Sequence, residues 1–72
     1  MRLFTRYLDA RAAVREIITD LHQEGFLGSP GEIYAEVCDR LGKKLGADWV
    51  AILELLIPFI LNLIERFFPN QS

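Results

Sequence analysis

The chain has 72 residues, of which 51% are hydrophobic and 25% are charged, and its formal net charge at pH 7 is −2. This length accommodates one domain, and the hydrophobic content excludes a disordered tail. There is no excess of positive charge to attract phosphate backbones, so nucleic acid is a disfavoured partner.

A first helix is predicted over residues 2–24. Its apolar residues alternate spacings of three and four, which draws one stripe along a helix: Leu3, Tyr7, Ala10, Val14, Ile17 and Leu21. The expected stop lies at Gly25, which can adopt the left-handed conformation, with Phe26 folding back onto Leu21 in a Schellman motif.

A second helix is predicted over residues 30–45. Ser29 is a favourable N-cap, Pro30 suits the first helical position, and Glu32 lies three residues after the cap, which makes a capping box. Ile33, Val37 and Leu41 share one face of this helix. Gly46 is the expected end.

The third predicted helix, residues 49–68, is hydrophobic over an arc of roughly 200°. A narrow polar stripe lies on the side of the helix outside this arc and consists of Glu54, Pro58, Asn62 and Glu65. Asp48 can cap the start of the helix. Because Pro58 has no N–H for the carbonyl of Glu54, we expect a kink there, with the free carbonyl facing water.

Three arrangements would cover this apolar arc. The helix is the central member of a helical domain with the remainder buried against a partner, or it crosses a membrane, or it lies on a bilayer surface. The charges and Pro58 bring the energy of membrane insertion close to break-even, and the polar face carries acids where surface-bound helices carry Lys and Arg. The helical domain is therefore favoured, and the membrane remains the alternative.

A chain of this length buries only a limited fraction of its apolar surface as a monomer. We therefore expect self-association, with a homodimer favoured, or a place in a larger assembly. The candidate interface residues are Phe4, Leu8, Trp49, Leu53, Ile57, Ile60, Ile64, Phe67 and Phe68. For Leu53, Ile60 and Ile64 an ordinary core position is favoured over the interface.

No catalytic constellation is visible. His22 falls in the last turn of the first helix, where a positive charge is favourable, and Cys38 lies on the apolar face of the second helix as a small hydrophobe. One cysteine and one histidine give neither a disulfide nor a metal site. We therefore expect no enzyme activity, no cofactor and no metal, and a cytoplasmic location with membrane association as the alternative.

The segment from Glu24 to Tyr34 resembles the turn between the two helices of ribbon-helix-helix antitoxins and repressors. Its glycine, its aromatic residue, its Gly-Ser pair and its Ser-x-x-Glu cap carry the resemblance. The resemblance implies an N-terminal strand whose outward residues, Arg2, Phe4 and Arg6, would read DNA. The heptad spacing that begins at Leu3 favours a helix over the same residues.

The sequence therefore predicts a small all-α domain of three helices. The favoured function is a non-enzymatic protein-interaction or assembly module that self-associates through its hydrophobic third helix. The alternatives are a small membrane protein with residues 49–68 inserted, and a ribbon-helix-helix-like DNA-binding regulator.

Overall fold

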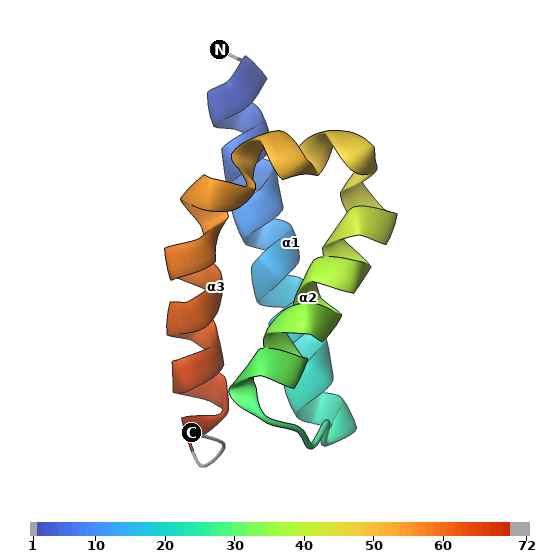
Figure 1. Ribbon diagram of the computed structural model, residues 1–72, viewed down its shortest axis with the longest axis vertical. Helices are drawn as coiled ribbons and strands as arrows, with labels where there is room; N and C mark the ends of the chain where they lie inside the picture. Colours follow the sequence, from blue (N-terminus) through green and yellow to red (C-terminus); the bar gives the residue numbers. More distant parts are fainter. Residues whose placement is uncertain (1, 70–72) are drawn as a thin grey trace.

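The computed structural model describes the backbone of residues 2–69 and the side chains of residues 6–46 and 49–69. Its elements are α1 (Arg2–Glu24), α2 (Pro30–Leu45), the 3-10 helix η1 (Ala47–Ile52) and α3 (Leu53–Phe67). No strand occurs over this described backbone. In Figure 1 the three α-helices lie side by side, and η1 crosses from α2 to α3 at the end of the molecule nearer the amino terminus. The predicted small all-α, three-helix domain is confirmed.

The absence of a strand from residues 2–69 also corrects what the ribbon-helix-helix resemblance implies. Residues 2–24 form one continuous helix, so the backbone of Arg2, Phe4 and Arg6 is helical. The resemblance is therefore confined to the turn between the first two helices, where residues that end one helix and begin the next are required.

The ends of α1 and α2 follow from local hydrogen bonding, as predicted. Gly25 has φ 73°, its N–H donates to the carbonyl of His22, and the N–H of Phe26 donates to the carbonyl of Leu21, which completes the Schellman motif. At the start of α2, the N–H of Glu32 donates to Ser29 Oγ at 3.2 Å and the N–H of Ser29 donates to Glu32 Oε1 at 2.7 Å. These bonds satisfy groups that a helix end otherwise leaves unpaired.

The predicted third helix begins differently from the expectation of one helix over residues 49–68. Residues 47–52 form η1, which has no side-chain cap, and α3 begins at Leu53 after Ile52, whose φ of −112° and ψ of 8° break the helical geometry. The predicted cap Asp48 lies outside the described side chains. The predicted kink at Pro58 is not confirmed, because α3 continues through Pro58 and the change of direction lies at the junction of η1 and α3 (Figure 1).

All four elements contribute to one core. Its buried members are Ala10, Ala13, Val14, Ile17, Ile18 and Leu21 of α1, Ile33, Val37 and Leu41 of α2, Trp49 and Ile52 of η1, Leu56, Ile60, Leu63 and Ile64 of α3, and Phe68 just after it.

A close approach between α2 and η1 gives Gly42 a packing role. A Cβ atom at position 42 would lie 3.3 Å from Nε1 of Trp49, which is tighter than most contacts of real side chains. The glycine therefore lets the indole of Trp49 lie directly against the backbone of α2.

Two ion pairs join the exposed edges of α1 and α2. Arg40 donates to both carboxylate oxygens of Glu24 at 3.2 Å and to Glu36 at 2.8 Å, and Lys44 donates to Glu16. The Arg40 hydrogen bonds hold the pKa of Glu24 below its ordinary value, and Lys44 does the same to the pKa of Glu16. The pairs connect the two antiparallel helices but contribute little to the free energy of folding, since exposed ion pairs are worth little.

Candidate functional site

The outward face of α3 carries both polar and apolar side chains. Its polar stripe, Glu54, Pro58, Asn62 and Glu65, is exposed, as the sequence predicted. Two leucines flank the stripe without being covered: Leu55 is 56% exposed and Leu61 is 44% exposed. The face is therefore mixed, with apolar side chains beside the carboxylates.

The nine predicted interface residues are distributed over three environments. Trp49, Ile60, Ile64 and Phe68 are buried, Leu53, Ile57 and Phe67 are half-buried, Leu8 is exposed, and Phe4 lies outside the described side chains. The chain itself covers the first group and partly covers the second, because η1 and α3 pack against both α1 and α2. The surplus apolar surface on α3 is therefore smaller than the sequence suggested, and the core positions favoured for Ile60 and Ile64 are observed.

The exposed apolar residues that sequence reasoning missed are Leu27, Val50, Leu55 and Leu61. A signal existed for two of them: Leu55 and Leu61 are three residues before and after Pro58, and residues three apart are neighbours on a helix surface. Because Pro58 lies on the water-facing polar stripe, Leu55 and Leu61 lie at the margins of that stripe. Leu27 lies in the linker between α1 and α2, where helical periodicity gives no information.

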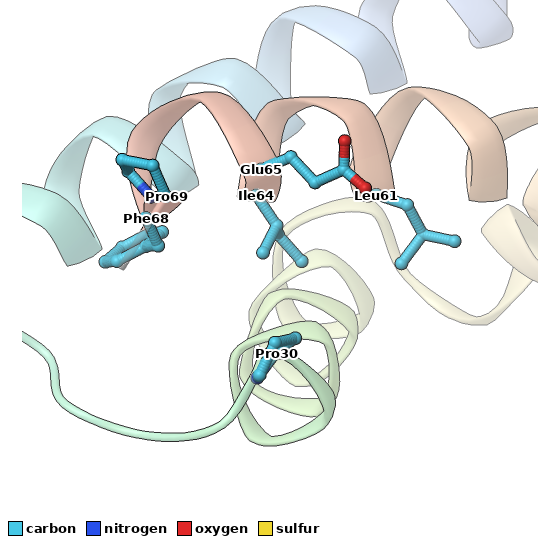
Figure 2. Close-up of a pocket in the computed structure, with 6 residues that line it drawn as sticks. All are labelled: Pro30, Leu61, Ile64, Glu65, Phe68 and Pro69. Atoms are coloured by element: carbon cyan, nitrogen blue, oxygen red, sulfur yellow. The ribbon is translucent and has the colours of Figure 1, made fainter. Parts of the chain in front are cut away.

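An apolar groove of about 350 Å³ lies between α3 and the start of α2. Its lining comprises Pro30, Leu61, Ile64, Glu65, Phe68 and Pro69. Figure 2 shows Ile64 projecting from α3 toward Pro30, with Leu61 on one side of it and Phe68 on the other, while Glu65 extends toward Leu61. We call this the α2–α3 groove. Its walls suit an apolar side chain, with one carboxylate at the edge.

A second groove, of about 400 Å³, lies on the opposite side of α3, between α3 and α1. Its lining comprises Arg11, Arg15, Pro58, Phe59, Asn62, Leu63 and Arg66. The guanidinium carbon of Arg11 lies 4.5 Å from the ring centroid of Phe59 and 5.7 Å from that of Tyr7, within the range of cation–π contact. We call this the α1–α3 groove.

The other candidate reactive groups are accounted for by packing. Burial raises the pKa of the Cys38 thiol, an effect that the neighbouring Tyr34 partly offsets, and burial also raises the pKa of Tyr34. His22 makes edge contacts with the rings of Phe67 and Phe68, with centroids 5.7 Å away in each case. These contacts join the last turn of α1 to the end of α3, which is a structural role.

Within the described residues, no three His, Cys, Asp or Glu side chains are grouped so that they could hold a metal ion. None of the helices in that part of the chain has the length and apolar character that a bilayer-crossing helix requires. Comparison with protein-family models, with curated proteins and with solved structures gave no match. A function for the protein is therefore inferred from the fold, a small three-helix domain, and from the two grooves beside α3.

Proposed function

We propose that the protein is a non-enzymatic interaction module that self-associates through the outward face of α3. The observation that carries this proposal is the exposure of Leu55 and Leu61, centred on the exposed Pro58. Large apolar side chains that are exposed and clustered on one helix face are typical of a binding surface. We call these three residues the Leu55–Leu61 ridge.

The ridge is self-complementary. Consider a twofold axis that lies in the interface plane, passes beside Pro58 and is perpendicular to the ridge. This axis places Leu55 of each copy beside Leu61 of the other, as an isologous interface requires. Rows of residues three apart run obliquely to the helix axis, so two such ridges in contact make the helices cross steeply.

The α2–α3 groove extends this surface, because Leu61 belongs to both. In the twofold arrangement, Leu55 of the partner copy approaches the mouth of the groove between Leu61 and Pro30. The apolar walls there supply the contacts that a leucine side chain needs, and water leaves the groove as it enters.

The small apolar area that this interface would bury predicts a weak dimer. Two half-exposed leucines and a proline per copy, with the mouth of one groove, amount to less than a standard interface. We therefore expect a dissociation constant in the range of roughly 10 µM to 1 mM, which corresponds to a transient complex.

Sedimentation velocity over a concentration series tests the proposal, with a Leu55→Gln, Leu61→Gln double variant. Glutamine keeps the helix propensity and adds no charge, so the fold should be retained. Wild-type protein is expected to shift from monomer to dimer with concentration, and the double variant should stay monomeric. Leu27→Gln is the matched control, since Leu27 is 83% exposed and lies in the linker between α1 and α2. A wild type that stays monomeric at millimolar concentration, or a double variant that dimerises equally, refutes the proposal.

A further inference from the structure

The α1–α3 groove concentrates positive charge in an acidic protein. Arg11 and Arg15 contribute from successive turns of α1, Arg66 contributes from the last turn of α3, and no acidic residue lines the groove. The whole chain has eight Lys and Arg residues and a net charge of −2, so three of its cations are gathered at one place. Such a placement raises the local concentration of anions.

These three arginines differ from the basic residues of α2. Arg40, Lys43 and Lys44 each make an ion pair with a carboxylate. Within the part of the chain that the structure describes, Arg11, Arg15 and Arg66 make no ion pair. Their guanidinium groups therefore keep their hydrogen-bond donors available to a ligand.

Arg11 is held in place before any ligand arrives. Its guanidinium lies over the face of Phe59 at 4.5 Å and near Tyr7 at 5.7 Å, and the side chain is half-buried. A guanidinium stacked on an aromatic ring keeps the N–H donors at its edge free. A side chain already ordered loses less entropy on binding, so the groove has one preorganised donor, Arg11, beside two exposed ones.

The donor set fits a phosphate group better than a carboxylate. One guanidinium satisfies a carboxylate through two parallel hydrogen bonds, whereas three guanidiniums and the amide of Asn62 match the charge of nearly −2 and the three oxygens of a phosphomonoester. The remaining lining, Pro58, Phe59 and Leu63, is apolar. A volume of about 400 Å³ lies within the usual size of small-molecule sites.

We propose that the α1–α3 groove is a binding site for a small organic phosphate. Arg11, Arg15 and Arg66 donate to the phosphate oxygens, and the apolar lining contacts the organic part. The site is separate from the α2–α3 groove and does not depend on self-association.

Titration of the full chain with phenyl phosphate, followed by ¹H–¹⁵N NMR, tests this site. We expect saturable shifts of the amide signals around Arg11, Arg15 and Arg66, and an affinity that falls with added NaCl because the charges are close to solvent. An Arg15→Gln, Arg66→Gln double variant should bind at least about tenfold more weakly, since each guanidinium gives a charge-assisted bond. Both side chains are exposed, so circular dichroism should show an unchanged fold.

Matched controls make the result specific. Lys43→Gln removes one positive charge from the exposed face of α2 and should leave binding unchanged. Benzoate, which offers a ring and a carboxylate, should bind more weakly than phenyl phosphate. Equal affinity for the two ligands, no saturable shift with millimolar phenyl phosphate, or equal binding by wild type and the arginine double variant overturns the proposal.

A vesicle experiment identifies the source of the phosphate. Phosphatidylcholine vesicles containing phosphatidic acid present the same phosphomonoester on a lipid surface. Co-sedimentation that the arginine double variant loses, together with phenyl phosphate binding, supports the site and assigns it to a lipid headgroup. Phenyl phosphate binding without co-sedimentation supports the site and assigns it to a soluble compound.

Discussion

Leu55 and Leu56 are adjacent, identical residues of α3 with opposite environments, and they allow a sharp test of how this helix is oriented. Leu56 is 0% exposed within the core, whereas Leu55 is 56% exposed on the outward face. Replacing each with alanine removes the same atoms from the same helix. Any difference in stability between the two variants therefore reports the surroundings of the side chain.

The expected difference is large. Truncating a fully buried leucine loses transfer energy and leaves a cavity, which costs about 3 kcal/mol, whereas truncating Leu55 should cost about 0.5 kcal/mol because most of its side chain is already in water. At the usual value of about 0.05–0.15 kcal/mol per residue, a domain of this length is expected to have a free energy of unfolding of about 4–11 kcal/mol. Leu56→Ala therefore removes a substantial share of the stability, and Leu55→Ala removes little.

Thermal unfolding followed by circular dichroism at 222 nm measures both variants. At about 4–8 °C per kcal/mol for a domain of this size, Leu56→Ala should lower Tm by about 12–24 °C and Leu55→Ala by about 2–4 °C. The protein should be kept at low micromolar concentration so that self-association does not contribute. Equal losses, or a larger loss for Leu55→Ala, would refute the orientation of α3 and with it the Leu55–Leu61 ridge.

Two further predictions concern titratable groups. Because Arg40 lowers the pKa of Glu24, the stability from this pair is fully present above the unfolded carboxyl pKa of about 4.3 and is lost as pH falls through the lower folded pKa. The Tm difference between wild type and Arg40→Gln should therefore be constant near neutral pH and shrink below about pH 4.3, and a difference that persists at low pH would contradict the role of the pair. Burial raises the pKa of Cys38, so the native thiol should react with a chromogenic disulfide reagent at pH 8 much more slowly than in urea, and equal rates would show that the thiol is not covered.

The sequence was most informative where local chemistry decides the structure. Gly25, the Ser29 and Glu32 pair, and Gly46 set the helix ends through bonds within a few residues, and all are found as predicted. The start of α3 was predicted four residues early, because six residues are too few to separate a 3-10 helix from an α-helix by periodicity.

The candidate sites were less accessible because they depend on tertiary packing. Whether Trp49 or Phe68 is covered is decided by the positions of α1 and α2, which no spacing within α3 reveals. Arg15 and Arg66 are far apart along the chain, and only the packing of α1 against α3 brings them to one groove. Leu55 and Leu61 are not among the predicted interface residues, although their place beside Pro58 is visible in the helical projection.

The uncapped start of α3 has a consequence for how the protein folds. The α1–α2 pair has a Schellman motif, a capping box and interhelical ion pairs of its own, and its contacts span a short linker, so it is the unit expected to form first. α3 begins without a side-chain cap and depends on that pair for its packing, so it is expected to dock last. Both proposed binding surfaces involve α3, and ligands that hold it in place would slow the opening of the least independent part of the fold. Binding at either groove should therefore appear in hydrogen exchange as added protection of the amides in α3, ahead of any change in the α1–α2 pair.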